Sequence, residues 1–229
     1  MRIKLFAILL FLTCFASAQT YEIGAFAGGS NYIGDVGPTT YINPNSVAIG
    51  GLAKWNLSNR YSYRLSVIYT QLQSDDADSE NSARQQRDFS FENDLLEVSV
   101  GMEFNFVEFN LHDFSNPVTP YIYGGVSYVR YNDLYFEGNT AEHNRNKSTF
   151  AIPMALGVKG KIGTRFVLGG EIGARYTFTN NLDGSDPGTQ DVGINPVRFG
   201  NSFSDDWFVF TGVTLTYTFG KKPCYYCFD

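Results

Sequence analysis

The chain has 229 residues, of which 43% are hydrophobic and 17% charged, and it is rich in phenylalanine (20), tyrosine (15) and glycine (23). This composition favours β-sheet over helix, and the length suits one sizeable domain. The formal net charge of −6 makes nucleic acid an improbable partner.

The first 18 residues have the three parts of a secretory signal peptide. Arg2 and Lys4 give a positively charged start, residues 5–15 an apolar core, and residues 16–18 a small-residue cleavage site. An apolar core this short falls well below the roughly 20 residues that a membrane-spanning helix needs. We therefore expect cleavage after Ala18 and export of the remaining chain.

Eight segments alternate between apolar and small or polar residues with the period of two that is typical of β-strands. In chain order the predicted strands are 21–29, 46–57, 61–73, 94–106, 120–131, 148–162, 165–178 and 206–220. The faces of 120–131 stay unassigned because both carry tyrosines. Pro153 lies inside the sixth strand, where it removes a ladder hydrogen bond and predicts a bulge.

The predicted connections fall into two classes. Those after the second and sixth strands have a few residues and the one after the fourth has about 13, whereas the other four have about 16 to 27. Short periplasmic turns and long external loops are typical of outer-membrane barrels, and they place both termini in the periplasm. A soluble lipocalin-like barrel is the alternative, but bulky aromatic residues opposite a small, glycine-rich set favour the membrane form.

The sequence thus predicts an all-β fold, an eight-stranded antiparallel up-and-down transmembrane β-barrel at 19–220. The signal peptide occupies 1–18, and a periplasmic tail occupies 221–229.

The residues predicted to face the interior carry both signs of charge. They include Lys54, Arg64, Glu97, Glu103, Lys159, Lys161, Arg165, Glu171 and Arg175. An eight-stranded barrel has room only for its own side chains, and buried charges need partners. We therefore expect an ion-pair network across the lumen, whose members would be Arg64, Glu97, Glu103, Lys159, Glu171 and Arg175. A charge-lined pore is the alternative.

Few residues suggest catalysis or metal binding. His143, Asp133 and Ser148 could be drawn as a triad, but a solvent-exposed loop histidine is the favoured interpretation. The acidic segments 75–80 and 183–186 could hold calcium, although neither has the ligand spacing of an EF-hand, and we expect solvated loops. The histidines and cysteines show no zinc-ligand pattern. We predict no catalytic residue, cofactor or metal.

The tail 221–229 contains the only cysteines that follow the signal peptide. Cys224 and Cys227 are candidates for a disulfide in an oxidising compartment, with each other or with a partner. The tail extends past the aromatic Phe219, at which the barrel is expected to end. Its docking candidates are Lys221, Lys222, Tyr225 and Tyr226.

Short segments rich in glycine and aromatic residues give the chain a family resemblance. They are GGSNYIGDVG at 28–37, PYIYGG at 120–125, RYTFTNNLD at 175–183 and TLTYTFG at 214–220. With eight predicted strands, the chain resembles the OmpA/OmpX-like small barrels of Bacteroidetes, and within them the PorG-type barrels of the type IX secretion system. The resemblance implies a partner rather than a reaction, namely the periplasmic ring of the PorK lipoprotein and PorN.

We therefore expect a non-enzymatic barrel in contact with outer-membrane lipid. It would anchor a periplasmic protein-secretion or gliding-motility assembly through the turn 107–119 and the tail. The alternative is a structural or surface-binding OmpX-like barrel whose long external loops contact ligands. An outer-membrane enzyme is the third hypothesis.

Overall fold

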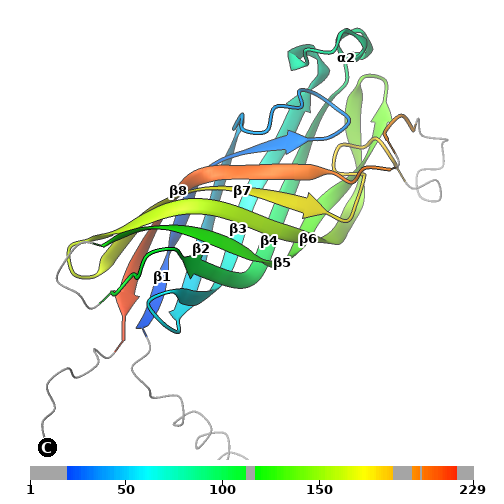
Figure 1. Cartoon of the computed structure of the whole chain (residues 1–229). Coiled ribbons are helices and arrows are strands. Elements are labelled where there is room, and N and C mark those ends of the chain that lie inside the picture. The colour runs from blue at the N-terminus through cyan, green and yellow to red at the C-terminus, as the bar shows by residue number, and fades with distance from the viewer. Residues whose placement is uncertain (1–19, 112–116, 188–197, 202, 221–229) are drawn as a thin grey trace, which may run out of the picture.

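A computed structural model describes residues 20–111, 117–187, 198–201 and 203–220. They form a closed barrel of antiparallel strands in up-and-down order (Figure 1). The strands are β1 (Thr20–Ile33), β2 (Ser46–Asn56), β3 (Tyr61–Asp75), β4 (Ser90–Asn105), β5 (Val118–Glu137), β6 (Thr140–Ile162), β7 (Phe166–Thr177) and β8 (Trp207–Phe219). β8 pairs with both β7 and β1, which closes the barrel. The predicted eight-stranded antiparallel fold is confirmed.

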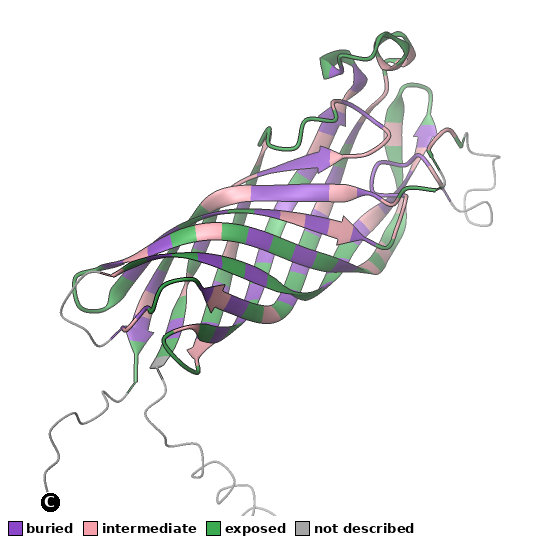
Figure 2. Ribbon diagram, in the orientation of Figure 1, coloured by how far each residue is buried: buried purple, intermediate pink, exposed green. Residues whose placement is uncertain are grey.

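Buried and exposed residues alternate along the strands, as the purple and green bands of Figure 2 show, so successive side chains point in turn to the lumen and to the outer surface. β3 is the most regular case, since every second residue from Ser62 to Leu72 is buried and those between are exposed. On β5, whose faces the sequence left open, Tyr121 and Tyr123 face inward and Ile122 faces outward. Apolar side chains dominate the outer surface of the strands, whereas the inward side chains include charged and hydroxylic residues.

The two ends of the barrel differ. β1 begins and β8 ends at one end, which we call the terminal end; the other, which carries helix α2, is the cap end (Figure 1). The cap comprises residues 34–45, 76–89, 134–141, 178–187, 198–201 and 203–206. Within it lie the 3₁₀ helix η1 (Asp76–Asp78) and α2 (Ser82–Arg87). Asn81 caps α2 by accepting a hydrogen bond from the backbone N–H of Ala83. No helix in the described residues is long and apolar enough to span a membrane.

The segment 132–147, predicted as a loop, is instead a β-hairpin. Pairing of β5 with β6 continues to Glu137 opposite Thr140, and Gly138, with a φ of 77°, lies in the turn. Its β6 half, 140–147, is almost entirely polar, and Leu134 and Phe136 are the core residues of its β5 half, so the segment lacks the sustained alternation of a half-buried strand. Backbone hydrogen bonds to the neighbouring strand define it instead.

The bulge predicted at Pro153 is wrong. The β5–β6 register is the same on both sides of Pro153, and the β6–β7 pairs run through it without a shift. Proline removes one donor, and the β5–β6 ladder simply lacks pairs beside it. The register shifts instead between Asp133 and Leu134, nearer the hairpin turn.

The interior has two halves of different chemistry. Towards the terminal end the inward residues are charged or hydroxylic, as predicted. Towards the cap end they are apolar, and this part of the core was missed. Its fully buried members include Phe26, Ile68, Leu72, Leu95, Val129, Phe208 and Phe210.

Candidate functional site

Glu103 of β4 is the centre of an ion-pair network in the polar half of the lumen. One of its carboxylate oxygens lies 2.8 Å from Lys54 Nζ, and the other accepts a hydrogen bond from Lys159 Nζ. Arg64 Nη1 lies 3.8 Å from the same carboxylate. The Arg64 guanidinium donates two hydrogen bonds to Glu171, from Nη1 at 2.6 Å and from Nη2 at 2.7 Å. All five side chains are buried. Each charge is therefore opposed by at least one partner, as burial requires.

A second ion pair lies closer to the apolar half. Arg175 Nε donates to Glu97 at 3.1 Å, and its Nη1 donates to the carbonyl oxygen of Gly173 at 2.7 Å. The guanidinium carbon is 4.5 Å from the ring centroid of Phe210. The cation thus has a carboxylate, a carbonyl and an aromatic face around it.

Tyrosine and hydroxyl groups occupy much of the remaining polar lumen. Tyr121 Oη donates to Glu171 at 2.6 Å, and Tyr123 Oη donates to Ser99 Oγ at 3.1 Å. Glu22 accepts from Thr216 Oγ1 at 2.5 Å. The interior in this half is filled by side chains bonded to one another, which is the arrangement of a plugged barrel rather than a channel.

The six residues predicted for the lumen network fall into two groups. Arg64, Glu103, Lys159 and Glu171 lie in the first, and Glu97 and Arg175 form the second. Sequence reasoning placed Lys54 inside but gave it no partner, and it missed Glu22 and Tyr121. The alternation of β1, which puts Glu22 on the face opposite Tyr21 and Ile23, was the available signal for Glu22.

Arg165 was predicted to face inward, and this is wrong. It is exposed in the turn before β7, which begins at Phe166. Its Nη1 donates to Tyr217 Oη at 2.5 Å on the outer surface. A turn residue does not follow the in-and-out order of the strand after it.

A small apolar cluster closes the lumen at the terminal end. Phe109 and Leu111, from the chain after β4, pack with Val167 of β7. Lys159 Nζ lies 4.9 Å from the ring centroid of Phe109, and the Phe109 N–H donates to Asn59 O at 2.9 Å. This part of the turn 107–119 therefore folds into the barrel rather than projecting from it.

In the cap, Asp76 is fully buried. Its carboxylate accepts from Arg87 Nε at 2.7 Å, from Arg87 Nη2 at 2.9 Å and from the Gly37 N–H at 2.8 Å. The Arg87 guanidinium also stacks 4.6 Å from the ring of Phe199. The expectation of a solvated loop is wrong for Asp76. Together with Arg87 it links the segments 34–45, 76–89 and 198–201.

Two further carboxylates are buried beneath the cap. Asp206 accepts from Tyr32 Oη at 2.6 Å and from the Leu182 N–H at 2.8 Å. Asp183 accepts from the Ser185 N–H at 2.9 Å, and its Oδ2 has no hydrogen-bond partner in the described structure. Burial raises the pKa of Asp206 well above its ordinary value, and the negative charge of Asp183 raises it further. Burial also raises the pKa of Asp183, so the pair favours a bound proton. The solvated loop predicted at 183–186 is wrong for Asp183 and Ser185, which are both buried.

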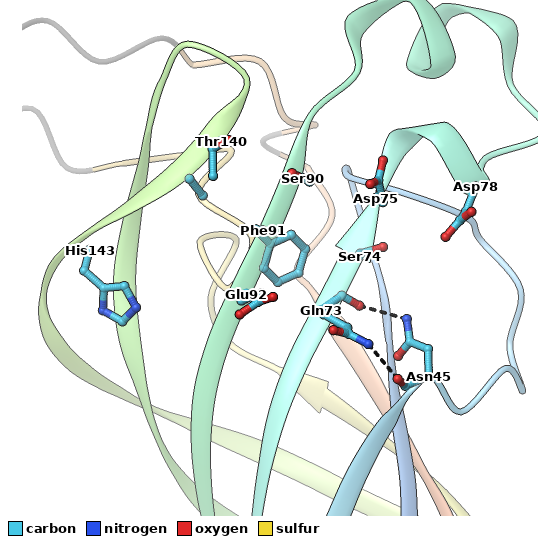
Figure 3. A pocket seen from close by; sticks show the side chains of 11 residues that line it. Asn45, Gln73, Ser74, Asp75, Asp78, Ser90, Phe91, Glu92, Thr140 and His143 are labelled. Carbon is cyan, nitrogen blue, oxygen red and sulfur yellow. Dashed lines mark hydrogen bonds between the residues drawn. The ribbon is translucent and has the colours of Figure 1, made fainter.

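A groove of about 550 Å³ opens beside the β5–β6 hairpin (Figure 3). Asn45 and Gln73 line one side of it and exchange hydrogen bonds between side chain and backbone, at 2.6 and 3.0 Å. Its lining is mostly polar and includes Asp75, Asp78, Ser90, Glu92, Thr140 and His143. Its carboxylates make it suited to cationic or hydroxyl-rich groups.

The residues weighed as a triad are not brought together. Asp133 is buried and forms an ion pair with Lys147 at 2.8 Å. His143 and Ser148 are both on β6, where five residues span about 17 Å. Where the structure is described, no group of three or more His, Cys, Asp or Glu could hold a metal ion. Cys224, Cys227, Lys221, Lys222, Tyr225 and Tyr226 lie outside the described residues, as does the predicted signal peptide.

The outer wall carries a continuous apolar surface. Its exposed residues include Ile23, Ile49, Leu65, Val67, Val98, Val100, Met102, Met154, Leu156, Leu168, Ile172, Val213 and Leu215. Aromatic pairs lie above and below it. Tyr21 stacks on Phe219 near the terminal end, and Tyr176 contacts Trp207 near the cap end. This is the surface of a barrel that spans an outer membrane.

The paired, filled lumen and the apolar wall define the class of the protein as a transmembrane β-barrel. The chain belongs to the family described as "Domain of unknown function (DUF6089)", whose model matches residues 1–229. No curated protein matches the chain in sequence.

Several solved barrels are similar to this chain. Ail, the attachment invasion locus protein of Yersinia pestis, solved with the heparin analogue sucrose octasulfate, has 13% identity and a TM-score of 0.48 over 89% of this chain and 100% of its own. The N-terminal barrel of Pseudomonas aeruginosa OprF has 12% identity and a TM-score of 0.44, covering 87% and 97%. P. aeruginosa OprG has 11% identity and a TM-score of 0.45, covering 90% and 98%.

Proposed function

We propose that this protein is a non-conducting, non-enzymatic outer-membrane barrel that anchors a periplasmic protein-secretion or gliding-motility assembly. The filled lumen carries the proposal. Glu103 and Glu171 bind three cations from three other strands, so the polar half offers neither an aqueous path nor an internal chamber for a substrate. The two ends of the barrel are therefore the surfaces that remain for binding a partner.

The terminal end is the proposed anchoring surface. The described chain enters and leaves the barrel there, at Thr20 and Phe219 (Figure 1), and short turns at this end favour a periplasmic orientation. Of the proposed contact turn, Val107 and Glu108 are exposed, whereas Phe109 is buried. The surface would therefore consist of the rim of this turn together with the tail 221–229. The resemblance to PorG-type barrels implies a PorK/PorN-like ring as the partner.

The test is co-purification from detergent-solubilised membranes, with the PorK-like lipoprotein detected directly. Deletion of 221–229 is expected to release the lipoprotein, while the barrel keeps the electrophoretic mobility of its folded form in an unheated gel sample. A cap variant, Arg87→Gln, is the control and should retain the partner. Unchanged recovery of the lipoprotein after the deletion would contradict the proposal. Parallel samples with and without reductant determine whether Cys224 and Cys227 contribute.

A second candidate function is surface binding by the cap, and the groove of Figure 3 favours it. In this alternative the β5–β6 hairpin and the segment 76–89 contact a cationic or hydroxyl-rich ligand outside the cell. Glu92→Gln with His143→Ala should then lower the adhesion of intact cells to such a ligand and leave partner recovery unchanged. Equal adhesion of the wild type and this variant would argue against it.

A further inference from the structure

The loop that follows β1 first covers the mouth of the barrel, where Val36 is buried in the apolar core, and then residues 40–44 lie against the outside of the barrel. Asn31 faces outward, because its neighbours Ser30 and Tyr32 make hydrogen bonds inside the barrel. Asn31 Nδ2 donates to the carbonyl oxygens of Thr40 and Tyr41, at 3.2 and 3.3 Å. These bonds hold residues 40–41 against the wall.

A glycine allows this approach. At Gly29, also on the outer face of β1, an added Cβ would lie 2.6 Å from Pro44 Cβ. Any larger residue would push the loop away from the wall. The loop is therefore a fixed part of the outer surface.

Between this loop and the outer faces of β7 and β8 lies a groove of about 740 Å³. Its floor is apolar and is formed by the outward-facing side chains of Ala174, Trp207 and Val209. Val209 is only 4% exposed although it faces away from the lumen. The upper rim is mostly polar and includes Asp35, Thr39, Arg84, Asn201, Ser204 and Asp205. The volume lies in the range of about 300–1,000 Å³ that is typical of small-molecule sites.

The floor is continuous with the apolar wall. Ile172 on β7 and Val213 on β8 continue the same faces downward and are exposed. Tyr176 marks the upper boundary of the wall, since its ring contacts Trp207 while its hydroxyl donates to Asp205 at 2.6 Å. The groove therefore begins where aromatic residues meet the lipid–water interface of a membrane barrel.

Exposed apolar side chains flank the groove on the loop side and on the β8 side. Tyr41, at 77% exposure, and Ile42 project from the loop after β1, and Phe203, at 99%, precedes β8. Such side chains are disfavoured in water and are suited to contact with lipid. They point to lipid rather than a water-soluble molecule as the occupant.

The charges on the rim indicate the head group. Three carboxylates line the groove, Asp35, Asp205 and Asp206, and Arg84 is the one cation in its lining. Asp206 is buried and already accepts from Tyr32 and Leu182, so Asp35 and Asp205 are the carboxylates available to a ligand. Arg84 already donates to the carbonyl oxygens of Gly34 and Gly37. A primary ammonium group, which has three donors, complements the spare lone pairs of these carboxylates, whereas a quaternary ammonium group has no donor.

We propose that this groove binds one amine-bearing lipid of the surrounding membrane. An acyl chain lies along Ala174 and Trp207, and the ammonium group donates to Asp35 and Asp205. The inference rests on the proposed placement in the outer membrane and is independent of any periplasmic partner.

The test uses the full-length protein in bilayer nanodiscs of phosphatidylglycerol that contain equal amounts of phosphatidylethanolamine and phosphatidylcholine. After transfer to mild detergent, native mass spectrometry counts the lipids retained by each barrel. We expect one phosphatidylethanolamine per barrel, in about tenfold preference over phosphatidylcholine. A preference of this size corresponds to one charge-assisted hydrogen bond that phosphatidylcholine cannot make. Ala174→Trp should abolish retention by filling the floor, and Asp205→Asn should remove the preference. Leu168→Trp, on the outer face of the same strand, is the matched control and should behave as the wild type.

Equal retention of the two lipids by the wild type would overturn the inference, as would retention by Ala174→Trp equal to that of Leu168→Trp. In both cases the barrel is inserted and the membrane placement stands. A folded wild-type chain that fails to enter the nanodisc would instead refute the placement, and the lipid site with it.

Discussion

Replacing Glu103 by glutamine is expected to destabilise the barrel more than removing one of its lysine partners. The carboxylate serves both Lys54 and Lys159, so the amide leaves two buried ammonium groups without their closest counter-charge, while Arg64 keeps Glu171. Breaking a buried pair in this way costs about 3–5 kcal/mol, and we expect a loss in that range. Lys159→Met leaves Glu103 paired with Lys54 at 2.8 Å, so its cost should be close to that of one charged hydrogen bond, about 2 kcal/mol.

The assay is urea unfolding of the barrel in lipid, followed by the fluorescence of its two tryptophans, Trp55 and Trp207. Met102→Leu, on the outer face of β4, is the control and should cost less than about 1.5 kcal/mol. The double variant Glu103→Gln/Lys159→Met should recover part of the loss, because it removes one of the unpaired ammonium groups. A cost for Glu103→Gln no larger than that of Lys159→Met would refute the reasoning that Glu103 is the centre of the network.

Three further predictions concern the cap, the lumen and the wall. Burial raises the pKa of Asp183, so the stability contributed by its neutral form is complete below about pH 3.9 and is lost as pH rises through the raised pKa. The melting temperature of the wild type should therefore fall with rising pH more steeply than that of Asp183→Asn; parallel curves would contradict this. In planar bilayers the wild type should give no stable ohmic current, and a steady porin-like conductance would refute the filled lumen. Gly101→Val would place Cβ 2.3 Å from the carbonyl oxygen of Gly124. We expect it to lower the free energy of unfolding in urea by about 1–3 kcal/mol. Gly170→Val is its control, because a Cβ added at Gly170 has no neighbouring atom within 4 Å. Equal stability of the two variants would contradict the close approach of the Gly101 and Gly124 backbones.

The wall of the barrel could be predicted from sequence because its signal is local. In β4, Leu96, Val98 and Val100 alternate with Glu97 and Ser99, and the period of two alone assigns each to the lipid side or the lumen. The strand count and the up-and-down order followed from eight such segments. The β5–β6 hairpin could not be found in this way, because its alternation is confined to Leu134 and Phe136 and its other strand, 140–147, is almost entirely polar.

The interior and the cap were decided by tertiary structure. Arg64 and Glu171 are 107 positions apart in sequence and lie on β3 and β7, which are not neighbours in the barrel, so only its closure brings them within 2.6 Å. Likewise, Asp183 resembles a solvated loop residue in sequence, and it is buried because the cap segments fold over the apolar half of the lumen. The sequence by itself determined which side of the wall each strand residue faces, since that depends on the residue's place in its own strand. Which charges meet across the lumen, and which carboxylates lose their water, depends on contacts between distant segments, and these exist only once the barrel has closed.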